Sequence, residues 1–124
     1  MAKILYIEDI QDNITLVEKI VTSRGHEFLF ARNAESGLAM AFETRPDLIL
    51  LDLGLPDADG QTLSVWLKGD PALSSTPIIV LTAWPEEVVR QTVNAYNLNG
   101  YLCKPFSLME LVNKIDFVLG TKEP

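Results

Sequence analysis

The chain has 124 residues, which is the length of one domain and leaves no room for a separate output domain. Its formal net charge of -7 argues against nonspecific binding to nucleic acids or to anionic membranes, because phosphate groups attract basic surfaces. With one cysteine, no apolar stretch of about 18 residues and no room for a signal peptide, the chain is expected to be cytoplasmic.

The first half of the chain alternates apolar strands with amphipathic helices. A strand over Lys3–Ile7 is followed by a helix over roughly 12–24 and a second strand near 27–31. Asn33 is placed to cap a second helix that begins at about Ala34 and turns three residues toward the core, namely Leu38, Ala41 and Phe42. Pro46 ends that helix before the apolar run Asp47–Asp52, which predicts a buried central strand.

The second half continues the alternation. A short helix over about 61–69 packs through Leu63, Trp66 and Leu67, and the strand Pro77–Leu81 follows. A fourth helix opens at Pro85 and carries four apolar positions, Val88, Val89, Val93 and Tyr96. After the strand Gly100–Cys103, a capping-box pattern at Ser107 opens the last helix, whose apolar stripe is Leu108, Leu111, Val112, Ile115 and Leu119. Five strand–helix units predict an α/β fold with a parallel sheet between two helix layers, formed by residues 1–120 with a short tail at 121–124.

Polar residues stand where the strands end. Glu8 and Asp9 follow the first strand, and Asp52 closes the central one. In an open parallel sheet, ligands bind at the carboxyl ends of the strands, so three carboxylates are expected to converge there and to bind a cation, with Mg²⁺ favoured. Thr82 and Lys104 end two further strands and offer a hydroxyl and an ammonium to phosphoryl oxygens, which makes Asp52 the expected phosphate acceptor.

Four segments together resemble the receiver domain of two-component response regulators. They are Glu8–Asp9, Asp52–Gly60, Thr82–Ala83 and Tyr101–Phe106, and their order and spacing cover roughly the whole chain. The resemblance implies a stand-alone, chemotaxis-regulator-like receiver with a flavodoxin-like, doubly wound (βα)5 fold and strand order 2-1-3-4-5.

The resemblance also implies a phosphoryl-transfer site. Asp52 would take a phosphoryl group from a phosphohistidine of a sensor histidine kinase or a histidine phosphotransfer protein. Asp9, Asp52 and the Gly54 carbonyl would bind Mg²⁺, for which Mn²⁺ can substitute, while Glu8 acts through water or directly. Glu8 departs from the commonest form of the motif, which has two aspartates. Lys104 would contact the phosphoryl group.

Several residues around the site are assigned by the same resemblance. Pro105 would follow a cis peptide bond. Thr82 and Tyr101 would form a switch that carries phosphorylation to the fourth helix, last strand and last helix, where an unknown protein target binds. The domain is expected to be a monomer or a phosphorylation-dependent dimer. Gly54 and Trp84 flank the path of water toward the phosphorus, and both are expected to slow hydrolysis.

Other residues receive structural interpretations. Asn97 stands where receiver domains often have glycine after the fourth helix, and asparagine is the best substitute for glycine in a left-handed cap. His26 is expected at the surface without a role, and Cys103 is expected in the core.

A phosphoacceptor signalling domain would not be an enzyme toward other molecules. Three alternatives to this function are also consistent with parts of the sequence. An aspartate-nucleophile phosphatase needs a second acid two positions after the nucleophile, where this chain has Gly54. A flavodoxin-like binding domain needs a phosphate-accepting loop after the first strand, where Glu8 and Asp9 would repel phosphate. A receiver-like scaffold would bind partners without phosphorylation, and such proteins lose acceptor, acid or lysine, all of which this chain keeps.

Overall fold

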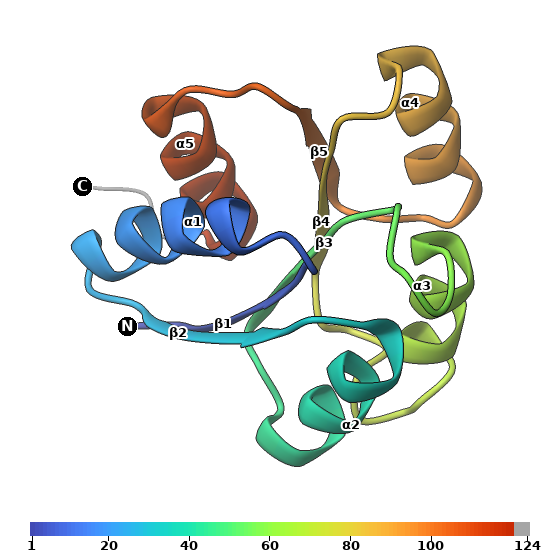
Figure 1. The fold of residues 1–124 in the computed structure, drawn as a ribbon. Coiled ribbons are helices and arrows are strands. Elements are labelled where there is room, and N and C mark those ends of the chain that lie inside the picture. Colours follow the sequence, from blue (N-terminus) through green and yellow to red (C-terminus); the bar gives the residue numbers. More distant parts are fainter. Residues whose placement is uncertain (121–124) are drawn as a thin grey trace.

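Five parallel strands form the centre of the protein in the computed structural model, which describes residues 1–120 (Figure 1). The strands are β1 (Lys3–Ile7), β2 (Glu27–Ala31), β3 (Leu48–Leu51), β4 (Ile78–Thr82) and β5 (Gly100–Cys103). Their order, β2-β1-β3-β4-β5, confirms the predicted topology. The tail predicted at residues 121–124 lies outside the described residues.

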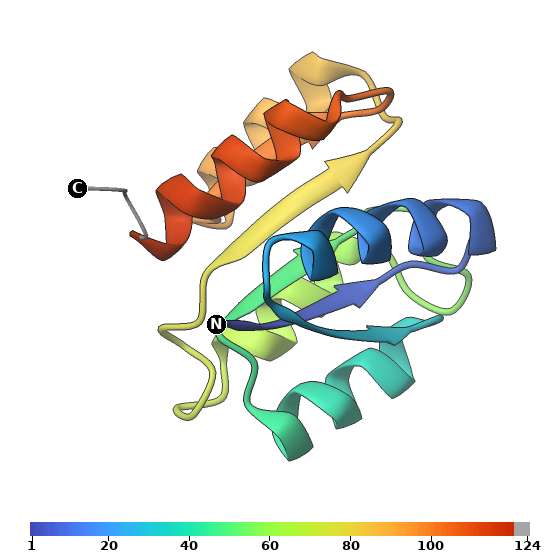
Figure 2. The ribbon, with the colours of Figure 1, turned by 90° about the vertical axis from the view of Figure 1, so that its left-hand side faces the viewer.

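Five helices alternate with the strands and cover both faces of the sheet. They are α1 (Gln11–Ser23), α2 (Ala34–Thr44), α3 (Gly60–Lys68), α4 (Glu86–Ala95) and α5 (Leu108–Leu119). Helices α1 and α5 lie side by side on one face, and α2, α3 and α4 cover the other (Figures 1 and 2). None of the helices formed by residues 1–120 is long and apolar enough to cross a membrane.

The two faces of the sheet bury separate hydrophobic cores, because successive side chains of a strand point in opposite directions. Ile4 and Tyr6 face α1 and α5, whereas Leu5 and Ile7 face α2 and α3. The central strand β3 is fully buried, as its uninterrupted apolar run predicts. The strand arrows in Figure 2 point the same way, so all five carboxyl ends reach one edge of the sheet.

The helix ends follow the predicted local chemistry. The Asn33 side chain accepts a hydrogen bond from the Ser36 N–H at 2.8 Å and caps α2. Ser107 and Glu110 form both hydrogen bonds of the capping box at the start of α5. Asn97 has φ +57° just after α4, the left-handed conformation expected at this position.

Two large side chains that were predicted to pack in the core are instead exposed. Phe42 is 43% exposed and Trp66 is 48% exposed. The buried stripe of α2 runs through the small residues Ala34, Gly37 and Ala41, and α3 buries Leu63 and Leu67, as predicted, together with Gly60 and Ser64. A Cβ on Gly37 would come within 2.7 Å of the Ile7 side chain, and one on Gly60 within 2.8 Å of the Asp52 carbonyl oxygen.

Three further positions differ from the sequence-based expectation in the same direction. Leu108, Val88 and Tyr96 were assigned to apolar core stripes, but they are 53%, 39% and 38% exposed. Leu108 is the first residue of α5, before the helix reaches the sheet, and α4 buries only the narrow line that includes Val89 and Thr92.

Two smaller residues complete the comparison with the sequence. His26 is half-buried rather than at the surface, and its Nδ1 accepts a hydrogen bond from the Ala2 N–H at 3.0 Å, which ties the loop before β2 to the start of the chain. Cys103 packs partly buried against the core, as predicted.

Candidate phosphoacceptor and metal site

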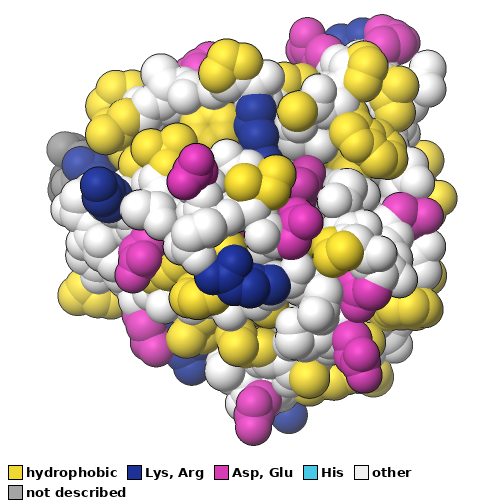
Figure 3. Space-filling view, viewed as in Figure 1, with side chains coloured by type: hydrophobic (Ala, Val, Ile, Leu, Met, Phe, Trp, Pro, Cys, Tyr) yellow, Lys and Arg dark blue, Asp and Glu magenta, His cyan; other side chains and the backbone are white. Residues whose placement is uncertain are grey.

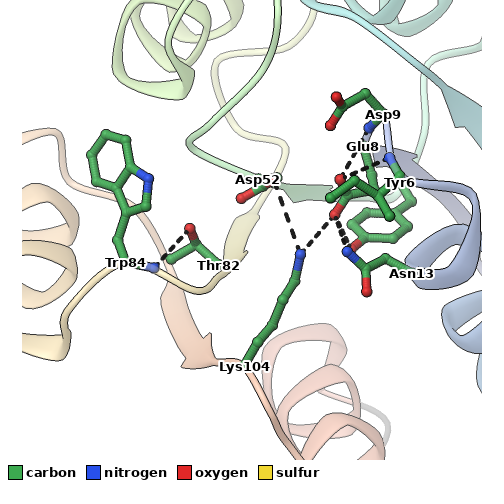
Figure 4. A network of polar contacts seen from close by, with 9 residues as sticks. Tyr6, Glu8, Asp9, Asn13, Asp52, Thr82, Trp84 and Lys104 are labelled. Carbon is green, nitrogen blue, oxygen red and sulfur yellow. Dashed lines mark hydrogen bonds and ion pairs between the residues drawn. The ribbon is translucent and has the colours of Figure 1, made fainter.

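Four strands deliver polar side chains to one place at the carboxyl edge of the sheet (Figure 4). Glu8 and Asp9 follow β1, Asp52 follows β3, Thr82 ends β4 and Lys104 follows β5. The residues that the sequence placed at this edge therefore lie together. Figure 3 shows acidic side chains near the middle of this face with basic side chains beside them.

Three carboxylates form the acidic part of the site. Glu8, Asp9 and Asp52 each offer one oxygen, and these oxygens lie within 4.8 Å of one another. Glu8 and Asp52 are buried, whereas Asp9 is open to solvent. Burial raises the pKa of Asp52, and repulsion from Glu8 adds to this effect, while Lys104 and hydrogen bonds from Thr82 and the Gly54 backbone only partly oppose it.

The charges of the site do not balance within the protein. Three carboxylates and the Lys104 ammonium leave two uncompensated negative charges. A divalent cation with oxygen ligands fits this donor set in both charge and chemistry. Asp9 is open to solvent, and Asp52 is a buried carboxylate whose charge Lys104 compensates only partly, so the two together suit such an ion.

Glu8 has a different environment from the two aspartates. Its Oε1 accepts hydrogen bonds from the Tyr6 hydroxyl at 2.9 Å, the Asn13 amide at 3.2 Å and Lys104 Nζ at 2.7 Å. Its Oε2 accepts from the backbone N–H groups of the next two residues, at 3.0 and 3.2 Å. Five donors occupy both oxygens, so this arrangement favours contact between Glu8 and a metal ion through water over direct coordination.

Lys104 makes the largest contribution to keeping Glu8 ionised. Burial alone would raise the pKa of this fully buried carboxyl, but the hydrogen bond and charge of Lys104, together with hydrogen bonds from the Ile10 backbone and the Tyr6 hydroxyl, outweigh burial, so the pKa is lowered. Lys104 Nζ lies 3.9 Å from the nearest Asp52 oxygen, farther than from Glu8. The lysine therefore stands between both acids and is bound more closely to Glu8.

The turn after β5 fixes the position of Lys104. Its backbone N–H donates to the Thr82 carbonyl at 2.8 Å, and the Lys104–Pro105 peptide bond is cis, as expected from the sequence. The hydrogen bond to Thr82 holds the base of the lysine side chain at the end of β4, from which the ammonium reaches the acidic cluster (Figure 4).

Thr82 and Tyr101 occupy neighbouring strands but point to different surroundings. The Thr82 side chain is fully buried, and its hydroxyl oxygen lies 3.4 Å from the Trp84 backbone nitrogen, which donates to it. The Tyr101 hydroxyl donates to Glu86 at the start of α4 at 2.9 Å. In this structure Tyr101 is thus directed toward α4 and away from Asp52.

Gly54 and Trp84 lie next to each other at the mouth of the site. A Cβ on Gly54 would stand 3.6 Å from the Trp84 indole nitrogen, which is ordinary van der Waals contact. The two residues expected to flank the path of water are therefore neighbours. A larger side chain at position 54 would also have room to fit.

Four residues that support the site or the loops around it were missed by the sequence analysis. Tyr6 and Asn13 hold Glu8, Glu86 holds Tyr101, and Asp57 accepts hydrogen bonds from two backbone N–H groups at the start of α2, at 2.7 and 2.9 Å. Tyr6 had a usable signal, because residues two apart on a strand share a face and Tyr6 precedes Glu8 by two. The other three contacts join separate elements and have no local signal.

Comparisons with known proteins agree with this geometry. The sequence matches the response regulator receiver domain family over residues 4–116. It is 32% identical over 117 residues to the polar-differentiation response regulator DivK of Brucella anthropi, covering 94% of this chain and 95% of that protein. The chemotaxis response regulator CheY4 of Vibrio cholerae superimposes with a TM-score of 0.89 and 27% identity, over 95% of this chain and 98% of that one.

A third relative carries a metal ion. The receiver domain of the sensor histidine kinase PA1611 of Pseudomonas aeruginosa PAO1 has a magnesium ion coordinated in its active site cleft. It superimposes with a TM-score of 0.88 and 29% identity, covering 96% of this chain and 98% of that chain. The matched length, the strand order and the acidic cluster lead to one conclusion: this chain belongs to the response regulator receiver domain family of two-component signalling.

Proposed function

We propose that this receiver domain accepts a phosphoryl group on Asp52 from a phosphohistidine and that the modification changes its partner-binding surface. The observation that carries the proposal is the position of Asp52, a buried carboxylate at the tip of the central strand with an ammonium at 3.9 Å and two further carboxylates beside it. A carboxylate in that place is a nucleophile that needs no general base.

The transfer itself is a displacement at phosphorus. An Asp52 carboxylate oxygen forms the new O–P bond while the P–N bond to the donor imidazole breaks, and the imidazole nitrogen leaves with the electron pair of that bond. The product is an acyl phosphate. Lys104 is within reach to pair with a phosphoryl oxygen as negative charge accumulates, and the buried Thr82 hydroxyl can donate to another.

Mg²⁺ fits the site, with Asp9, Asp52 and the Gly54 carbonyl as its proposed ligands and Glu8 acting through water. When bound, the ion supplies the positive charge that lets two anions approach each other. Mn²⁺ has similar ligand preferences and is a proposed substitute.

The surface proposed to respond is formed by α4, β5 and α5. Two features support this assignment. The Tyr101 hydroxyl binds Glu86 of α4, so a movement of Tyr101 toward Thr82 must release a contact of that helix. Hydrophobic side chains are exposed on the same elements, including Val88, Tyr96 and Phe117, the last of which is 70% exposed.

The proposed partners are a sensor histidine kinase or a histidine phosphotransfer protein as donor and a protein target on the α4–β5–α5 surface. The domain would promote only its own phosphorylation and dephosphorylation. Gly54 offers no acid to protonate a leaving alcohol, which disfavours the phosphatase alternative.

A direct test is incubation with acetyl phosphate and Mg²⁺ followed by intact-mass measurement. Wild type should gain one phosphoryl group, whereas Asp52→Asn and wild type in excess chelator should gain none. An unmodified wild type would favour a phosphorylation-independent scaffold, and an adduct of equal yield in Asp52→Asn would exclude Asp52 as the acceptor.

A further inference from the structure

Tyr6 places a hydroxyl group inside the protein that the proposed phosphoryl transfer does not use. The side chain is fully buried, and its hydroxyl donates to Glu8 Oε1 at 2.9 Å (Figure 4). Burial raises the pKa of Tyr6 well above its ordinary value, and the Glu8 charge raises it further, so the hydroxyl keeps its proton and remains a donor. The strand pleat places Tyr6 on the face of the sheet that α1 and α5 cover, and Glu8 follows it two residues later along the chain.

Asn13 brings a second donor to the same oxygen from a different element. It lies in the first turn of α1, and its amide nitrogen is 3.2 Å from Glu8 Oε1. Lys104 is the third donor, at 2.7 Å. Of these three groups, only Lys104 has a proposed role elsewhere, because it must also reach the phosphoryl group on Asp52.

Release of Lys104 from Glu8 is therefore a step of the proposed reaction. Glu8 is fully buried, and a buried carboxylate that loses its lysine partner is costly unless other hydrogen bonds remain. After Lys104 leaves, Oε1 keeps the Tyr6 and Asn13 donors, and Oε2 keeps its two backbone N–H groups. Hydrogen bonds to a charged group are among the stronger ones, so these donors lower the cost of the release.

We propose that Tyr6 and Asn13 are positioning residues that hold the charged Glu8 in place, so that Lys104 can move from Glu8 to the phosphoryl group. This inference rests on the proposed function of Asp52. The inference predicts different effects on the binding of Mg²⁺ and of a phosphoryl analogue, whereas general damage to the site would weaken both. Mg²⁺ alone leaves Lys104 on Glu8, whereas a phosphoryl analogue on Asp52 requires Lys104 to leave.

The test compares the affinities of Mg²⁺ and of beryllofluoride, a phosphoryl analogue, in Tyr6→Phe and Asn13→Ala. Mg²⁺ affinity is measured by calorimetry, and beryllofluoride binding by fluorine NMR at saturating Mg²⁺. Each variant should bind beryllofluoride about tenfold more weakly, equivalent to about 1.4 kcal/mol, with Mg²⁺ affinity unchanged. The matched control is Ser64→Ala, which removes another fully buried hydroxyl, bonded to the Gln61 carbonyl on α3, and should change neither affinity.

The outcomes separate the inference from the proposed function. A wild type that fails to bind beryllofluoride at saturating Mg²⁺ refutes the proposed function and with it this inference. If wild type binds normally, unchanged beryllofluoride affinity in both variants overturns the inference alone. Equal weakening of Mg²⁺ and beryllofluoride also overturns it, because that result indicates general damage to the site. Asn13→Ala carries the test by itself if Tyr6→Phe does not fold.

Discussion

Removal of one negative charge from the acidic cluster should stabilise the protein when no metal is present. The perturbation is Asp52→Asn, which keeps the shape of the side chain and eliminates its repulsion with the other two carboxylates. Their oxygens lie no more than 4.8 Å from one another, and the compensating Lys104 ammonium is 3.9 Å from Asp52. The raised pKa of Asp52, caused first by burial and opposed by Lys104, indicates that ionisation of this group is unfavourable in the folded state.

Simple electrostatics gives the size of the effect. At an effective dielectric constant of about 20, the repulsion of Asp52 from Glu8 and its repulsion from Asp9 each cost about 3.5 kcal/mol at 4.8 Å. The attraction between Asp52 and Lys104 at 3.9 Å offsets about 4 kcal/mol of this cost. The difference is a net repulsion of about 3 kcal/mol, which water around the open Asp9 reduces. We therefore expect Asp52→Asn to raise the free energy of unfolding by about 2 kcal/mol and the melting temperature by about 8 °C.

The sign of the pH dependence follows from the raised pKa. The folded protein holds the Asp52 proton to higher pH than the unfolded chain, so ionisation of Asp52 lowers wild-type stability as pH rises from about 4, the unfolded pKa, through the folded pKa. The advantage of Asp52→Asn should be absent below that window and present in full above it.

Thermal and urea unfolding of both proteins in chelator and in Mg²⁺ provide the assay. Mg²⁺ at about 100 times its dissociation constant stabilises a protein by about 2.7 kcal/mol, and the variant lacks one proposed ligand, so Mg²⁺ should cancel its advantage. A variant less stable than wild type in chelator at neutral pH would refute the electrostatic reasoning. An advantage that persists unchanged in saturating Mg²⁺ would refute the proposed metal ligands.

Three other predictions test separate parts of the site. Mg²⁺ should raise the melting temperature of wild type but not of Asp9→Asn, and an equal rise in both would remove Asp9 from the metal site. Beryllofluoride should shift the backbone amide NMR signals of Tyr101 and residues 86–96, because the Tyr101 contact with α4 must change; unshifted signals would contradict the proposed switch. Gly54→Asn and Trp84→Glu should each speed loss of phosphate after the donor is removed, because each can orient a water at the mouth of the site, and equal or slower decay in both would show that neither position guards the water path.

The sequence predicted the strands and the strand-end residues well, because both depend on local signals. An uninterrupted apolar run can only be a buried segment, and Asp52 at its end must reach the edge of a parallel sheet. Helix faces were less predictable. Helix α2 packs on the sheet through small residues such as Gly37, which leaves Phe42 largely exposed, and α3 buries Leu63 and Leu67 as predicted but leaves Trp66 exposed.

The sequence could place Glu8 in the site but could not define its environment. Whether an acid binds a metal directly or through water depends on how many donors already occupy its oxygens. For Glu8 those donors come from β1, α1 and the end of β5, elements whose contacts form only in the folded protein. The same reason explains why the contact of Tyr101 with Glu86 was not foreseen.

The central claim is that Asp52 is the phosphoacceptor, and mapping the modified residue tests it most directly. Wild type is treated with phosphoramidate, a donor with the P–N bond of a phosphohistidine, in the presence of Mg²⁺. Borohydride then reduces the acyl phosphate to a stable alcohol that peptide mass spectrometry can locate. We predict reduction at Asp52 and at no other carboxylate of the chain. Reduction at Glu8 or Asp9, or a phosphoryl group found on a side chain that borohydride does not reduce, would contradict the account.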